Sequence, residues 1–145
     1  MASFFCRNPK LYDMMNKILA TQFFDEKIAT LFPEQFDIIT EDPENMARQC
    51  NRMNESQIII LTKPGSIAKT ARVLADKVQE KTILLLSIES PDENHEPTTW
   101  LNLGAALAFA QTLDVGIYIV HENQYYYWNE IVMEADNVYK RQAVA

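Results

Sequence analysis

The chain has 145 residues, of which 48% are hydrophobic and 23% are charged. This length and composition are typical of one globular domain, here residues 1–145, and exclude a disordered, collagen-like or coiled-coil chain. Thirteen Lys and Arg residues against twenty Asp and Glu residues give a formal net charge of -7. Because binding to a phosphate backbone depends on clustered basic residues, the sequence argues against a nucleic-acid partner.

Runs of apolar and β-branched residues with the length of strands alternate along the chain with helical patterns. This alternation predicts a parallel sheet covered on both faces. The predicted strands are residues 2–6, 36–40, 57–62, 82–88 and 115–120. Nearly unbroken Ile and Leu in the third and fourth strands place these two at the centre of the sheet.

Start signals and hydrophobic periodicity predict helices between the strands. Asn8 before Pro9 and Asp42 before Pro43 each join an N-cap residue to a proline at the first helical position. The helix that starts at Pro9 is expected to be broken near Thr21 into two pieces within residues 9–32. Further helices are expected after Ser66, from Trp100 to Leu113, and from near Trp128.

The order of these elements predicts a three-layer, flavodoxin-like α/β fold with five parallel strands in the order 2-1-3-4-5. Right-handed crossovers and short connections leave few alternatives for five parallel strands. In such a sheet a ligand binds beyond the carboxyl ends of the strands, beside the switch point between strands one and three.

The expected helix between Trp100 and Leu113 has no charged residue. A helix that is apolar all round needs cover on more than its sheet side. Either it is deeply buried within one molecule, or a second copy packs against it at the small residues Gly104, Ala105 and Ala108, which would make a homodimer. Polar residues interrupt the run, so the sequence does not indicate a membrane span.

Glycine, cysteine and histidine are scarce. The three glycines, against about ten at average usage, are too far apart for a glycine-rich phosphate loop. The two cysteines and two histidines lack zinc-ligand spacing, so no metal site is predicted. Without a disulfide framework or a recognisable leader, a reducing cytoplasm is the expected location. No particular cofactor is indicated.

Polar residues that follow the predicted strands are candidates for ligand binding. The Lys63 ammonium, the Ser66 hydroxyl and the N–H groups of the following helix could hold a phosphate or carboxylate, with Arg7 as a second cation. Alternatively, Ser66 is only an N-cap after a turn. Tyr125 lies in an aromatic run that could stack on a base. The candidate ligand-binding residues are Arg7, Asn8, Lys63, Gly65, Ser66, His121 and Tyr125.

Two acidic residues are candidates for catalysis. Glu41 and Glu89 each follow a predicted strand, where partial desolvation could make a carboxylate a general base or nucleophile. The alternative is that Glu41 belongs to the acidic start of the helix that Asp42 caps, and that Glu89 lies in a solvated acidic loop. No partner is identifiable for His121, so no catalytic triad is predicted.

The segment FDIITEDPENMARQCNRMNESQIIILTKPGS, with the pattern of residues 36–86, resembles the nucleoside 2-deoxyribosyltransferase-like proteins. Gly65-Ser66 stands where that family has Gly-Thr, and the phrase LGAA that starts at Leu103 resembles its E-L-G-A-A segment. The resemblance implies a flavodoxin-like fold, oligomers, and cleavage of an N-glycosidic bond by a glutamate. The matching positions here hold Lys69 and Asn102, and the related TIR-type domains imply the same missing glutamate.

Three hypotheses follow. The first is a non-catalytic member of this fold group that binds a nucleotide-like ligand or a protein partner. The second is an N-glycosidase or deoxyribosyltransferase that acts on nucleosides or NAD through Glu41 or Glu89, with Asn8 or Tyr125 orienting the substrate. The third is a structural protein that self-associates through the uncharged helix and needs no ligand.

Overall fold

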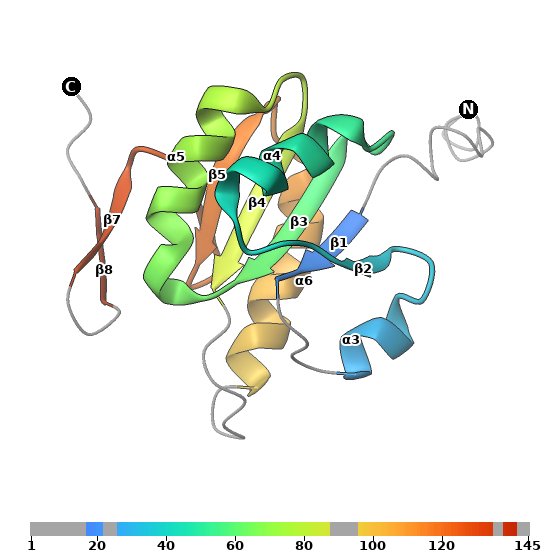
Figure 1. The fold of residues 1–145 in the computed structure, drawn as a ribbon. Helices are drawn as coiled ribbons and strands as arrows, with labels where there is room; N and C mark the ends of the chain where they lie inside the picture. The colour runs from blue at the N-terminus through green and yellow to red at the C-terminus, as the bar shows by residue number, and fades with distance from the viewer. Residues whose placement is uncertain (1–16, 22–25, 88–95, 135–137, 142–145) are drawn as a thin grey trace, which may run out of the picture.

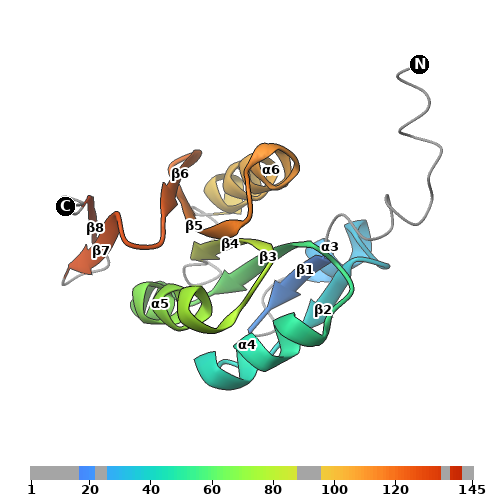
Figure 2. The ribbon, with the colours of Figure 1, turned by 90° about the horizontal axis from the view of Figure 1, so that it is seen from above.

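The computed structural model describes residues 17–21, 26–87, 96–134 and 138–141. A six-stranded sheet in the order β2-β1-β3-β4-β5-β6 lies between helices on both faces (Figure 1, Figure 2), which confirms the predicted α/β class. The strands of this sheet are β1 (Lys17–Ala20), β2 (Phe36–Ile38), β3 (Gln57–Thr62), β4 (Thr82–Ser87), β5 (Gly116–His121) and β6 (Gln124–Tyr127). The helices are α3 (Glu26–Leu31), α4 (Pro43–Arg52), the 3-10 turn η1 (Pro64–Ser66), α5 (Ile67–Lys77) and α6 (Glu96–Thr112).

Strands β1 to β5 are parallel and follow the predicted order 2-1-3-4-5. The sheet has one strand more than predicted, because β6 folds back antiparallel onto β5. Glu122 and Asn123 form the turn between them, with φ of 51° and 62°. Positive φ at both central residues gives a two-residue hairpin whose twist matches that of its strands.

The predicted strand at residues 2–6 lies outside the described residues, and β1 occupies residues that were predicted to be helical. Ile18 and Leu19 on β1 are fully buried, so burial between two strands outweighs the helical tendency of the local sequence. The helix predicted near Trp128 is also wrong, since an antiparallel pair, β7 (Ile131–Glu134) and β8 (Val138–Arg141), follows there. Short apolar runs fit both periods, and the helical reading was the wrong one.

Side chains of the central strands alternate between two hydrophobic clusters, one on each face of the sheet. Ile58 and Ile60 of β3 pack with α4 and α5, whereas Ile59 and Leu61 pack with α6. The same alternation holds along β4 and β5. Both faces are therefore covered, as the unbroken Ile and Leu runs predicted.

The crossover through α6 has the opposite hand to the one through α5. β3, β4 and β5 are successive neighbours in the sheet, but α5 packs on one face and α6 on the other (Figure 2). The β3-α5-β4 connection is right-handed and the β4-α6-β5 connection is left-handed (Figure 1). The expectation of right-handed crossovers throughout, which rests on their strong preference in parallel sheets, is wrong at this connection.

The outer side of α6 is exposed. Leu103, Ala106 and Ala110 face the sheet and are buried, whereas Leu101 is 62% exposed and Gly104 and Ala108 are also exposed. Deep burial of this helix within one molecule, one of the two expectations, is therefore wrong. Among the helices of the described residues, none has both the length and the hydrophobicity needed to cross a membrane.

Cys50 gives the fold a testable pH dependence. Its side chain is fully buried on α4 in the cluster with α5 and β3. Burial raises the pKa of its thiol from 9.0 to about 12, against the opposing effect of the Lys81 charge. The folded protein therefore holds this proton more tightly than the unfolded chain does, so the associated stability is complete below about pH 9 and is lost as the pH rises towards 12.

We expect the unfolding free energy of the parent protein to fall more steeply above pH 9 than that of Cys50→Ala, with the thiol contributing at most about 4 kcal/mol to the fall. Urea denaturation at neutral and alkaline pH measures both. Burial also raises the pKa of Tyr118. Because this tyrosine is present in both proteins, its titration does not contribute to the difference between their pH curves. Parallel pH curves for the two proteins would contradict the assignment.

Candidate functional site

The sheet order reverses at β1, which lies between β2 and β3. At its carboxyl end, Thr21 is buried; its N–H donates to the Leu61 carbonyl at 3.0 Å, and its hydroxyl donates to the same oxygen at 3.4 Å. The N–H of Ile39 donates to the Ala20 carbonyl at 3.0 Å. The ends of β1, β2 and β3 are therefore held together at the switch point, where doubly wound sheets bind ligands.

Two of the candidate residues meet at this edge. Glu41 follows β2 and Lys63 follows β3, and the Lys63 Nζ lies 3.7 Å from Glu41 Oε1. About half of each side chain is exposed. Glu41 is therefore a solvated carboxylate beside a cation, which is the setting of a charged surface residue rather than of a desolvated base.

The two helices that start beside these residues have different electrostatic ends. At the start of α4, the Asp42 carboxylate accepts a hydrogen bond from the Asn45 N–H at 3.1 Å, and Glu44 lies in the first turn, so the predicted N-cap is confirmed. At the start of α5, Ser66 occupies the N-cap position but its hydroxyl donates to the Lys63 carbonyl at 3.4 Å and caps no helical N–H. With no acidic residue in its first turn, α5 is the helix end that attracts an anion.

Gly65 lies in the turn between Lys63 and α5. A Cβ atom built there would meet nothing within 4 Å, so the space above the start of α5 is open. The predicted turn at Pro64-Gly65 is observed as η1, where the Ser66 N–H donates to the Lys63 carbonyl at 3.3 Å.

His121 and Tyr125 lie apart from this group. His121 ends β5, two strands from β3, a separation of roughly 10 Å, and its Nε2 lies 3.7 Å from Glu122 Oε1. Tyr125 is on β6 rather than in a loop. Its ring contacts those of Phe109 and Tyr118 edge to face, at centroid distances of 5.2 and 5.8 Å, on the α6 face of the sheet.

Arg7, Asn8 and Glu89 lie outside the described residues. Thr21 lies at the switch point, but the sequence does not mark it as a site residue, because its segment is predicted to be helical. The three apolar residues from Ile18 to Ala20, just before this threonine, are the available sequence signal, and so short a run fits a helix as well as a strand.

Asn102 has a structural role where the resembled family has a glutamate. Its Oδ1 accepts a hydrogen bond from the Asn123 N–H at 2.9 Å, which joins α6 to the β5–β6 turn. The other matching residue, Lys69, is exposed on α5. Neither position supplies an acid to the edge formed by β1 and β3.

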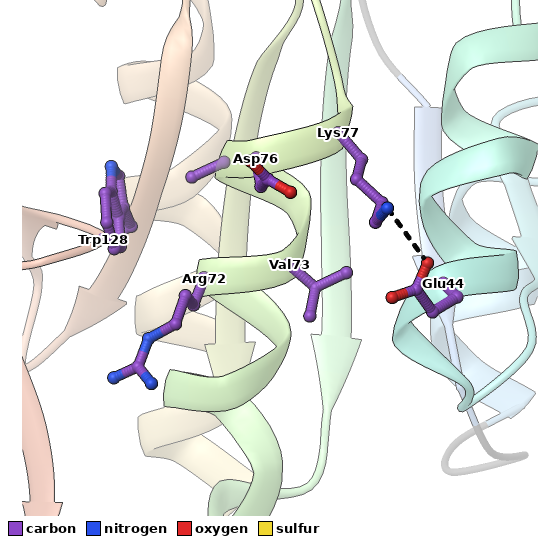
Figure 3. Close-up of a pocket in the computed structure, with 7 residues that line it drawn as sticks. Glu44, Arg72, Val73, Asp76, Lys77 and Trp128 are labelled. Atoms are coloured by element: carbon purple, nitrogen blue, oxygen red, sulfur yellow. Dashed lines mark ion pairs between the residues drawn. The ribbon is translucent and has the colours of Figure 1, made fainter.

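A groove of about 500 Å³ lies elsewhere, on the outer side of α5 (Figure 3). Its lining residues are Glu44, Arg72, Val73, Ala75, Asp76, Lys77 and Trp128. Lys77 Nζ lies 3.4 Å from Glu44 Oε2 at one end, and Trp128 stands at the other, packed against the hydrophobic cluster. Because its polar groups do not converge on one point, the groove lacks the usual organisation of a small-molecule site.

Comparison of the chain with models of protein families and with curated proteins finds no match. Within the described part of the chain, no three His, Cys, Asp or Glu side chains are grouped closely enough to hold a metal ion.

The hydrogen bond between Asn102 and the Asn123 N–H should contribute measurably to the stability of the protein. We expect Asn102→Ala to lower the unfolding free energy by about 1 kcal/mol, because the Asn123 N–H loses its acceptor. Thermal denaturation measures this change. Gln111→Ala on the same helix is the control, because Gln111 Nε2 donates to the Leu107 carbonyl within α6 at 3.2 Å. Equal stability of Asn102→Ala and the parent would show that the turn does not depend on this contact.

Proposed function

We propose that this protein is a flavodoxin-like, non-catalytic binding domain for an anionic, nucleotide-like ligand. The observation that carries the proposal is the uncapped start of α5 beside Lys63, at the switch point between β1 and β3. The start of a helix carries a partial positive charge and unpaired backbone N–H groups, and it attracts phosphate together with a neighbouring ammonium. A degenerate relative of the nucleoside 2-deoxyribosyltransferase-like proteins, located in the cytoplasm, fits this description.

The ion pair between Lys63 and Glu41 does not prevent such binding. A solvent-exposed pair with a gap of 3.7 Å contributes about 1 kcal/mol or less. A phosphate with several oxygens forms charge-assisted hydrogen bonds that are stronger than this pair. The ligand therefore displaces Glu41 from Lys63 at little cost.

The alternative is an N-glycosidase or deoxyribosyltransferase that uses Glu41 as its acid. Half-exposure and the adjacent ammonium favour a surface ion-pair role for Glu41 over that of a desolvated catalytic base. One substitution separates the two functions, because loss of the Glu41 charge helps an anion site and destroys such an enzyme.

We expect nucleoside phosphates or NAD to raise the melting temperature of the parent protein, and Lys63→Ala to weaken their binding roughly tenfold or more. Glu41→Gln should keep the affinity or raise it by up to about fivefold, since it removes a competing carboxylate. Glu44→Gln is the matched control, because it makes the same change in net charge away from Lys63, where Glu44 pairs with Lys77. Release of a free base by the parent and its loss in Glu41→Gln would establish the enzyme instead.

Self-association through α6 is a second candidate function. The exposed side of α6 carries Leu101, Gly104 and Ala108 at helical spacing, without a charge. A Cβ atom built at Gly104 would meet nothing within 4 Å, so another helix has room to approach closely.

If α6 is the interface, Ala108→Glu should convert a homodimer into a monomer, because it buries a carboxylate at the contact. Sedimentation at increasing protein concentration measures the change. Lys69→Glu on the exposed side of α5 tests whether added negative charge alone dissociates the protein. A parent protein that is monomeric at all concentrations would contradict this candidate.

A further inference from the structure

β6 ends the sheet beside β5 and carries the sequence QYYY, without a charge. In Figure 2 it lies beyond β5, with β7 and β8 displaced towards α5. The outer side of such a strand presents backbone groups that can pair with another strand.

The hairpin register shows which backbone groups point outward. Gln124 and Tyr126 pair with β5 on the inner side, and the Trp128 N–H donates to the Ile117 carbonyl at 3.0 Å. Because successive residues of a strand alternate in direction, the N–H and carbonyl of Tyr125 and Tyr127 point away from β5. The Asn123 carbonyl also points away from β5, because it lies opposite the inward Gln124 N–H in a trans peptide bond.

Two groups of this hairpin already have partners. The Tyr127 carbonyl accepts from the Glu130 N–H at 2.9 Å, and the Asn123 N–H donates to Asn102. Within the described residues, no hydrogen bond engages the remaining groups, which are the N–H and carbonyl of Tyr125, the Tyr127 N–H and the Asn123 carbonyl. They number two donors and two acceptors, symmetric about Tyr125.

This set is complementary to itself. If two β6 strands lie antiparallel with Tyr125 opposite Tyr125 of the second copy, each Tyr125 N–H meets the other Tyr125 carbonyl. Each Tyr127 N–H then meets the Asn123 carbonyl of the other copy. All four remaining groups pair, and the two groups that already have partners keep them.

The opposite edge of the sheet is protected. On β2, the Asp37 carboxylate accepts the Ile38 N–H at 2.8 Å, and this N–H faces away from β1 because Ile39, the next residue, donates to the Ala20 carbonyl. A charged side chain that accepts the hydrogen bond of an outward-facing N–H on an edge strand hinders pairing of that strand with another chain. β6 has no such residue.

The charge of the protein also favours this surface. A chain with a net charge of -7 repels its own copies except where carboxylates are absent. Tyr125 and Tyr127 are 40% and 51% exposed, and the contact of Tyr125 with Phe109 makes this edge continuous with the part of α6 after Trp100, which has no charged residue. A second copy presents the same uncharged surface and the same backbone pattern.

We propose that two copies of this protein pair through their β6 strands and form one continuous twelve-stranded sheet. This inference does not depend on ligand binding at β1 and β3. It also differs from pairing through α6. That helix packs mainly over β3 and β4, so five or six strand spacings separate the two α6 helices of this dimer, a distance of roughly 25 Å or more, beyond the 8–10 Å of packed helices.

Amide hydrogen exchange of the full chain at increasing concentration, up to about 1 mM, tests the pairing. The Tyr125 and Tyr127 amides should exchange at least about tenfold more slowly in the dimer. The Gln124 and Tyr126 amides face β5 and should be protected at every concentration, which also reports that the hairpin is folded.

Variants identify the surface. Tyr127→Lys places a charge at the edge and should give a monomer whose Gln124 and Tyr126 amides stay protected, whereas Tyr127→Phe keeps the ring and the amide and should still dimerise. Ala108→Glu on α6 should leave this dimer intact. A monomer at all concentrations overturns the proposal, and so does a dimer that Ala108→Glu dissociates and Tyr127→Lys does not.

Discussion

Burial of β3 and β4 on both faces is the constraint on which the rest of the structure depends. Every residue from Ile58 to Leu61 and from Ile83 to Leu86 is inaccessible or nearly so, so each face of the sheet needs its own cover. Helices α4 and α5 cover one face and α6 covers the other. The open carboxyl edge, the exposed side of α6 and the edge strand β6 are what this arrangement leaves to solvent.

The left-handed crossover divides that carboxyl edge into two parts. The start of α5, with Lys63 and Ser66, lies on one face, whereas α6, with Asn102, and the ring of Tyr125 lie on the other. On the α5 face, where a right-handed crossover would have placed α6, Tyr126 and Trp128 pack against the cluster beside α5. Residues that a uniform right-handed topology would group into one crevice are therefore separated.

Charge decides what the β1–β3 part of the edge can do. The start of α4 is already satisfied by Asp42 and has Glu44 beside it, whereas the start of α5 has Lys63 nearby and no acid in its first turn. The weak pair of Lys63 with Glu41 leaves that cation able to change partners. These features support the proposed binding of an anion at the start of α5.

The sequence by itself determined the α/β class, four of the five parallel strands (β2 to β5), the central place of β3 and β4 and the cap at Asp42, because unbroken apolar runs and N-cap chemistry are local signals. Only the tertiary structure decided that residues 17–20 form a strand, that α6 lies on the face opposite α5, and that Lys63 meets Glu41 while Tyr125 turns away. Each of these depends on which surfaces meet after the chain has folded, and such contacts join residues far apart in the sequence. A local pattern of four residues, or a polar side chain after a strand, does not contain that information.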